Sequence, residues 1–132
     1  MYIRTSVIST LKQIKTENAP AAIGPYSQAT QMHPFVFVSG QLPIDPATGK
    51  FPEGGVREQT RQSLKNLFAI LDEAGKCHVL KTTVFLADMG DFAAMNAVYA
   101  EFFQEPYPAR CAFAVKDLPK GALVEIDCIA AL

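Results

Sequence analysis

The sequence has few of the side chains that bind metals or form disulfides. Its three cysteines, Cys77, Cys111 and Cys128, are an odd number and include no CxxC pair. The two histidines, His33 and His78, lack the spacing of a ligand set with each other or with the cysteines. We therefore expect no metal site, and we expect a reducing compartment such as the cytoplasm.

The sequence also lacks an excess of charge of either sign. Twelve basic residues stand against 13 acidic ones, the formal net charge is -1, and only 19% of the residues are charged. Binding to duplex nucleic acid depends on clustered lysine and arginine, so this balance argues against a nucleic-acid partner. The hydrophobic fraction of 49% is high for a small domain, and it favours a homo-oligomer whose copies cover part of each other's surface.

Long apolar segments and internal repeats are missing as well. No apolar run reaches the ~18 residues of a membrane-spanning helix, so we expect no membrane partner. The length of 132 residues fits one domain with a single core, and no low-complexity tract divides it. The first fifteen residues are basic and contain no acidic side chain, so a mitochondrial import signal is the alternative to a simple N-terminal extension.

Hydrophobic spacing predicts an α+β domain. Strands rich in aromatic and β-branched residues are predicted over 35–41, 81–86, 109–115 and 123–129. Helices are predicted over 57–74, ended by Gly75, and from Asp88 or Asp91 to the residues before Pro106. We expect the last two strands to pair as an antiparallel hairpin and both helices to cover one face of a single sheet. Neighbouring subunits are expected to cover the other face.

The last predicted strand carries two carboxylates on one face. Glu125 and Asp127 lie two residues apart, whereas Val124, Ile126 and Cys128 point to the other face. Partial desolvation and the like charge would raise the pKa of at least one carboxyl toward neutrality, as a general acid or base requires. The alternative is the solvated outer face of an edge strand.

Arg110 stands inside the apolar run ARCAFAV, where a guanidinium requires an anionic partner. One candidate partner is Glu125 or Asp127 on the neighbouring strand, which would make an internal ion pair. The other is the carboxylate of a small substrate, which the forked donors of arginine bind at two points. Cys111 beside it is either a thiol activated by the guanidinium or an inert core residue.

Three further polar residues are candidates for a site. Asn96 interrupts the apolar stripe of the second helix, where a hydrogen bond to backbone is the structural alternative. Tyr26 follows Gly24 and Pro25, so its ring is either presented to a pocket or packed in the core. Ser39 is not predicted to be a hydrolase nucleophile, because the G-x-S-x-G pattern is absent and neither histidine sits in a nucleophile elbow with it.

Six sequence blocks occur in order between Glu17 and Ala130: GPYSQA, SGQ, KTTVFL, NAVYAEFF, PARCAF and LPKGALVEID. Together they resemble the RidA/YjgF family of imine deaminases. The resemblance implies a chorismate-mutase-like α+β domain over residues 12–132, preceded by an extension over 1–11, that forms a homotrimer with ligand clefts between subunits. It implies hydrolysis of 2-imino acids such as 2-iminopropanoate and 2-iminobutanoate to 2-keto acids and ammonia, without a cofactor.

The resemblance also implies roles for residues at matching positions. Arg110 corresponds to the carboxylate-binding arginine and Glu125 to the acid that positions water. The implied substrate-binding residues, besides Arg110, are Tyr26, Ser39, Gly40, Asn96, Cys111 and Ala112. The loops before Lys81 and Pro108 look shorter than in typical members, and the second of these bears on substrate size.

Two other functions have been attached to this family or fit the same clefts. One is an endoribonuclease or translation inhibitor, against which the neutral charge and the lack of an aromatic and basic stripe argue. The other is a non-catalytic small-ligand binder or chaperone, against which the presence of both Arg110 and Glu125 argues. Both remain alternatives to the deaminase.

Overall fold

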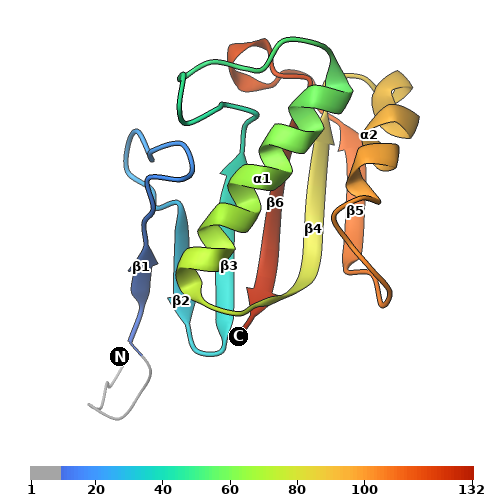
Figure 1. Ribbon diagram of the computed structural model, residues 1–132. Coiled ribbons are helices and arrows are strands. Elements are labelled where there is room, and N and C mark those ends of the chain that lie inside the picture. Colours follow the sequence, from blue (N-terminus) through green and yellow to red (C-terminus); the bar gives the residue numbers. More distant parts are fainter. Residues whose placement is uncertain (1–9) are drawn as a thin grey trace.

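The computed structural model describes residues 10–132, which form one mixed sheet and two α-helices (Figure 1). The strands are β1 (Lys12–Ile14), β2 (Ala29–Met32), β3 (Phe35–Gln41), β4 (His78–Leu86), β5 (Ala109–Ala114) and β6 (Val124–Ala131). The helices are α1 (Val56–Ala74) and α2 (Phe92–Tyr99), with short 3-10 turns η1 (Met89–Asp91) and η2 (Pro119–Gly121). Most of the expected extension over 1–11, and with it most of the candidate import signal, lies outside the described residues.

The six strands lie in the order β1-β2-β3-β6-β4-β5, and only the β4–β5 pair is parallel. The predicted hairpin between the last two strands is therefore wrong. Strand β6 lies between β3 and β4, and β5 pairs with β4 at the edge of the sheet. The reason is burial: alternate residues of β6 from Val124 to Ala130 are almost fully buried, which a central strand satisfies better than an edge hairpin.

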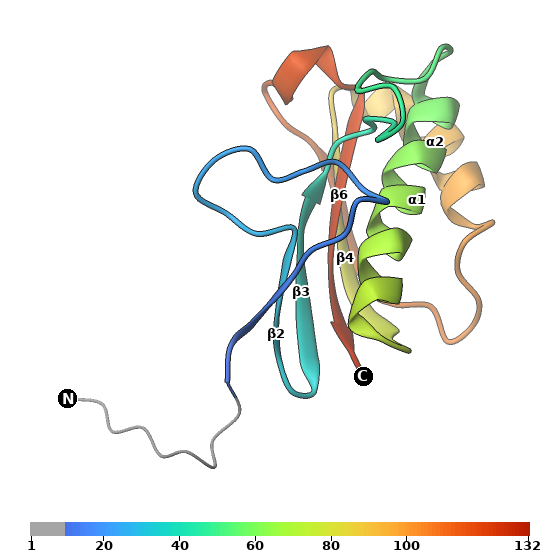
Figure 2. The ribbon, with the colours of Figure 1, turned by 60° about the vertical axis from the view of Figure 1, so that its left-hand side comes forward.

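Both helices lie on one face of the sheet, as predicted (Figure 2). The buried face of α1 carries Leu64, Leu67 and Ile70, which pack over β3 and β6. Burying each such side chain contributes roughly 1.5–3 kcal/mol, so this interface accounts for much of the core. No helix within residues 10–132 is long and apolar enough to cross a membrane.

The second helix is shorter than predicted. The carboxylate of Asp88 accepts a hydrogen bond from the Gly90 N–H at 2.7 Å and so caps η1, and α2 begins only at Phe92. Helix α2 ends at Tyr99, where the next backbone N–H groups turn back onto its last carbonyls. The following segment still packs against the helices, because the Phe103 ring lies 4.5 Å from that of Tyr99.

The opposite face of the sheet is not covered within the described residues. Phe35 and Phe37 alternate with the buried Val36 and Val38 and are 45% and 49% exposed. On the edge strand β5, Phe113 is 44% exposed. Aromatic side chains gathered on an exposed surface are typical of an interaction site. We call this surface the open face; its side chains include Met32, Phe35, Phe37, Phe85, Cys111, Phe113, Glu125, Asp127 and Ile129.

Candidate functional site

Arg110 lies on β5, on the face that the helices cover. Its Nη1 donates a hydrogen bond to Asn96 Oδ1 of α2 at 2.6 Å. Its Cζ lies 4.7 Å from the centre of the Tyr99 ring and 5.5 Å from that of Phe92. Aromatic faces attract the guanidinium but do not neutralise it, and within residues 10–132 no carboxylate lies within ion-pair distance of it. The guanidinium is therefore fixed in place with its charge available to an anion.

The alternative of an internal ion pair with Glu125 or Asp127 is wrong for this chain. Strands β5 and β6 are not neighbours, because β4 lies between them. Thr82 of β4 pairs in register with both Arg110 and Cys128, so these three side chains share the helix-covered face. Glu125 is three residues from Cys128 and therefore points to the open face. Arginine and acid lie on opposite faces of one sheet.

A cavity of about 500 Å³ opens at Arg110. Its lining residues within 10–132 are Asn96, Tyr99, Ala100, Tyr107, Pro108 and Arg110, and the guanidinium is the one charged group among them. This environment suits a small anion whose remaining part is uncharged. We call this cavity the arginine pocket. Sequence reasoning assigned no role to Tyr99 or Tyr107, although Tyr99 follows Asn96 by three residues and so shares its helix face.

Asn96 does not make the hydrogen bond to backbone that was its structural alternative. Its Oδ1 accepts from Arg110, and no other hydrogen bond of its side chain occurs within residues 10–132. The amide oxygen is an uncharged acceptor, so it orients the guanidinium without cancelling its charge. Asn96 therefore belongs to the same pocket as Arg110.

Glu125 is seated against Gly40, at the end of β3. A Cβ at position 40 would overlap Oε2 of Glu125 and would lie 3.3 Å from its Cγ. Only glycine leaves room for the carboxyl in this place. The neighbouring Ser39 donates from Oγ to the Ser27 carbonyl at 2.6 Å, and its N–H donates to the Gln28 carbonyl at 2.9 Å. The hydroxyl of Ser39 thus joins β3 to the segment that follows Tyr26.

The two carboxylates of the open face have perturbed acidity. Burial raises the pKa of Glu125, and the neighbouring charge of Asp127 raises this pKa further. Burial also raises the pKa of Asp127, against opposing contributions from Thr83 and Lys81. The predicted direction is confirmed, but burial is the larger cause and the like charge the smaller one. A carboxyl of raised pKa is suited to exchange a proton near neutral pH.

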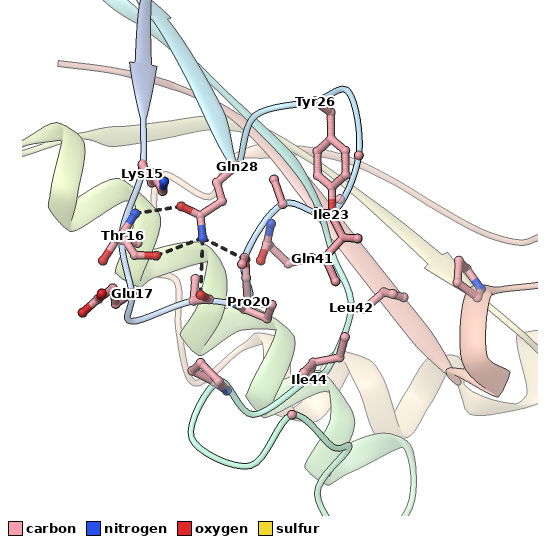
Figure 3. Close-up of a pocket in the computed structure, with 18 of the residues that line it drawn as sticks. Lys15, Thr16, Glu17, Pro20, Ile23, Tyr26, Gln28, Gln41, Leu42 and Ile44 are labelled. Atoms are coloured by element: carbon pink, nitrogen blue, oxygen red, sulfur yellow. Dashed lines mark hydrogen bonds between the residues drawn. The ribbon is translucent and has the colours of Figure 1, made fainter.

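A larger cavity, of about 1180 Å³, is lined by Tyr26 and by Gly40, the residue against which Glu125 is seated. Figure 3 shows its wall at Tyr26 and Gln28. The buried amide of Gln28 organises its wall. Gln28 Nε2 donates to the carbonyls of Thr16 and Pro20 at 3.0 and 2.8 Å, and Oε1 accepts from the Thr16 N–H at 2.7 Å. These bonds fix the loop that leads to Tyr26, whose ring is exposed rather than packed in the core. Gln28 is part of the GPYSQA block, but sequence reasoning gave it no role.

Cys111 and Ala112 fall outside both cavities. Cys111 pairs in register with Thr83 and is exposed on the open face, opposite in direction to Arg110. Ala112 pairs with Val84 on the helix-covered face and is half-buried. The structure therefore brings neither side chain to the pocket that Arg110 lines.

Six of the eight candidate residues thus form two groups. The arginine pocket holds Arg110 and Asn96. The second group, which we call the acid cleft, consists of Tyr26 and Gly40, which line the larger cavity, Glu125, whose carboxyl lies against Gly40, and Ser39, which bonds to the segment after Tyr26. A single chain does not bring the two groups together. Within residues 10–132 no three His, Cys, Asp or Glu side chains are clustered so that they could hold a metal ion.

The family model described as Endoribonuclease L-PSP matches residues 16–132. The chain belongs to the RidA/YjgF/RutC family. It is 54% identical over 124 residues to a RutC family protein of Sinorhizobium fredii, covering 92% of this chain and 98% of the relative. It is 52% identical over 122 residues to the 2-iminobutanoate/2-iminopropanoate deaminase of Mus musculus, covering 90% of each. The resemblance seen in the six sequence blocks is confirmed.

Solved structures of the RidA/YjgF/RutC family have the same fold. The YjgF gene product of E. coli superposes with a TM-score of 0.85 at 47% identity, covering 91% of this chain and 98% of that one. E. coli TdcF with bound serine superposes with a TM-score of 0.86 at 44% identity, covering 92% and 98%. Members of the family therefore share this sheet and its two helices, and one of them binds a small amino acid.

Proposed function

We propose that this chain hydrolyses 2-imino acids to 2-keto acids and ammonia in a cleft shared between two copies of a homotrimer. The observation that carries the proposal is the unpaired charge of Arg110 in a small pocket of otherwise uncharged groups. A 2-imino acid offers the carboxylate that this guanidinium requires. The deaminase names of mammalian relatives support the reaction.

For each step of the hydrolysis, this chain supplies a side chain that binds the substrate or transfers a proton. Arg110 binds the substrate carboxylate and fixes the direction of the C=N bond. The Glu125 carboxylate removes a proton from water as the water oxygen bonds to the imine carbon, and the acid then protonates the nitrogen. The C–N bond of this adduct then breaks as Glu125 transfers the hydroxyl proton to the nitrogen, so ammonia leaves, the keto group forms and Glu125 is again a carboxylate. The raised pKa of Glu125 suits both directions of transfer.

A second copy is required because the two groups lie on opposite faces of the sheet. In a ring of identical subunits, the same head-to-tail contact recurs, so the arginine pocket of one copy can meet the acid cleft of the next. The open face supplies an apolar surface for such contacts, with Phe35, Phe37 and Phe113 partly exposed. The family resemblance supports three as the number of copies.

The activity is tested by coupling the purified protein to a threonine dehydratase, which releases 2-iminobutanoate. We expect the chain to accelerate formation of the keto acid and to lower the amount of imine that a semicarbazide trap captures. Heat-denatured protein serves as the control for nonspecific effects. Unchanged capture of the imine at all protein concentrations would contradict the deaminase.

The shared cleft is tested by mixing two inactive variants, Arg110→Ala and Glu125→Gln. If each cleft takes its arginine from one copy and its acid from the next, randomly mixed rings contain both groups in about a quarter of their clefts. We expect activity to return to about that fraction after co-refolding, and not when either variant is refolded alone. No return, in samples whose mixing is verified by mass spectrometry, would contradict a site between copies.

We expect Asp127→Asn to shift the pH dependence of the reaction rather than abolish it. Asp127 raises the pKa of Glu125, so removing its charge lowers this pKa. Because the carboxylate form of Glu125 removes the proton from water, kcat/KM rises with pH through this pKa. The rise is therefore expected at lower pH in the variant, in profiles of kcat/KM measured with the same substrate. A shift to higher pH would contradict this arrangement of the two acids.

We expect Gly40→Ala to lower kcat by about 10²-fold while the chain remains folded. The added methyl group would occupy the space of the Glu125 carboxyl and displace it from the cleft. Gly55→Ala is the matched control for kcat, because a Cβ at Gly55 meets no atom within 4 Å and the residue lines neither cavity. Equal kcat for both variants, with circular dichroism showing folded protein, would contradict the seating of Glu125 against Gly40.

A further inference from the structure

Tyr99 joins the arginine pocket to the centre of the sheet. Its ring lies beneath the guanidinium of Arg110, with 4.7 Å between Cζ and the ring centre. Its hydroxyl lies 2.7 Å from Oγ1 of Thr82, and both groups are buried. Thr82 is also the residue of β4 that pairs in register with Arg110. One threonine on a buried strand therefore fixes the ring that faces the guanidinium.

We propose that Tyr99, held by Thr82, is a positioning residue that sets the plane of the Arg110 guanidinium. The inference rests on the deaminase function proposed above and extends it to residues that do not themselves react. Asn96 Oδ1 fixes one corner of the guanidinium but leaves rotation about that contact free. Stacking on the Tyr99 ring removes this freedom, because a guanidinium prefers to lie over an aromatic face.

The plane of the guanidinium matters because a carboxylate bound at two points lies nearly in that plane. Rotation of the fork would turn the bound substrate and move its C=N carbon away from the water that Glu125 activates. Among residues 10–132, Arg110 has no carboxylate partner that could restrain it instead. The ring of Tyr99 thus acts on the position of the reacting carbon through its contact with Arg110.

The hydroxyl of Tyr99 makes a hydrogen bond that a phenylalanine at this position could not make. Thr82 is completely buried on a central strand, so a hydrogen bond to it ties the ring to the most rigid part of the fold. Burial also raises the pKa of Tyr99, so the phenol stays protonated and the bond persists over the working pH range. Phe103 packs 4.5 Å from the same ring and supports it from the α2–β5 connection.

The test compares Tyr99→Phe and Thr82→Val, each of which removes one side of this hydrogen bond and keeps the shape of the side chain. We expect each to raise KM for the imino acid about tenfold, because the two-point contact weakens, and to lower kcat as well, because the reacting carbon is displaced. The double variant is expected to be no worse than either single one, because both changes remove the same interaction. Tyr99→Leu, which removes the ring, is expected to lower kcat/KM by about 10²-fold.

Phe68→Leu is the control for simple loss of stability. Phe68 packs against Phe102 and Phe103 but is not among the aromatic partners of Arg110. We expect this variant to lower the melting temperature and to leave KM unchanged. If Tyr99→Phe and Phe68→Leu behave alike, with lower stability and an unchanged KM, the positioning role is overturned.

A binding measurement separates this inference from the proposed function. Titration calorimetry with 2-oxobutanoate, the keto acid that carries the same carboxylate, measures the Arg110 contact without any reaction. Wild-type protein that does not hydrolyse imines would overturn the deaminase. Wild-type protein that hydrolyses them while Tyr99→Phe binds 2-oxobutanoate with unchanged affinity would overturn the positioning role alone. Weaker binding of the keto acid by both Tyr99→Phe and Thr82→Val supports the inference.

Discussion

Replacement of Arg110 by lysine is expected to lower kcat/KM for a 2-imino acid by about 10²- to 10³-fold while the protein remains folded. Lysine keeps the charge but has neither the fork that binds a carboxylate at two points nor the plane that stacks on Tyr99. Its ammonium would also lose the fixed geometry of the bond to Asn96 Oδ1. The substrate would still be attracted to the pocket but would no longer be oriented in it.

The steady-state rate of keto acid formation measures this effect, and sedimentation and circular dichroism report assembly and folding. Arg61→Lys is the matched control, because Arg61 makes an exposed ion pair with Glu101 at 3.0 Å and lines neither cavity. We expect the control to keep its activity. Full activity of Arg110→Lys would show that charge alone suffices and would refute the two-point contact.

Replacement of Glu125 by glutamine is expected to lower kcat by about 10²- to 10⁴-fold and to change the affinity for keto acid little. The amide has the size of the carboxyl and fits the same space against Gly40. It cannot accept a proton from water, so the addition to the imine carbon loses its base. Because the substrate carboxylate binds to Arg110, ligand affinity depends on another group.

Single-turnover rates together with calorimetry on 2-oxobutanoate separate the two quantities. Asp127→Asn is the matched control: it also neutralises a half-buried acid of β6, and it is expected to keep its full rate on the pH plateau. An unchanged kcat in Glu125→Gln would assign proton transfer to a different group. A large loss of keto acid affinity in the same variant would place Glu125 in binding instead.

Elements with a strong internal period were predictable from the sequence. Strand β3 is a run of aromatic and β-branched residues, β6 begins with alternating apolar and acidic side chains, and α1 repeats leucines at helical spacing. The predicted positions of these elements therefore agree with the structure within a few residues. Strands β1 and β2 were not predicted because they are short and partly polar; β2 pairs with β3, and β1 pairs with β2. The order of the strands could not be predicted from the sequence either. The turn at 118–121 is a local signal, and it does not indicate that β6 lies between β3 and β4.

The candidate site was predictable where a residue violates the pattern of its own element. A guanidinium in the apolar strand β5 and two acids on one face of β6 stand out without any structure. The partners of these groups depend on tertiary contacts. The pairing of Thr82 with Arg110 follows from the parallel β4–β5 register, and the seat of Glu125 follows from a bulge near Gly40. Neither leaves a signal in the spacing of residues along the chain.

The placement of guanidinium and acid on the two sides of one sheet has a consequence for mixed populations. In the proposed assembly, every subunit contributes to two different clefts. Its Arg110 lies in the cleft shared with one neighbour, and its Glu125 lies in the cleft shared with the other. A subunit that lacks both groups would therefore inactivate two clefts, although it is only one member of the ring. A minority of damaged subunits, exchanging freely among rings, would therefore remove a disproportionate part of the proposed activity.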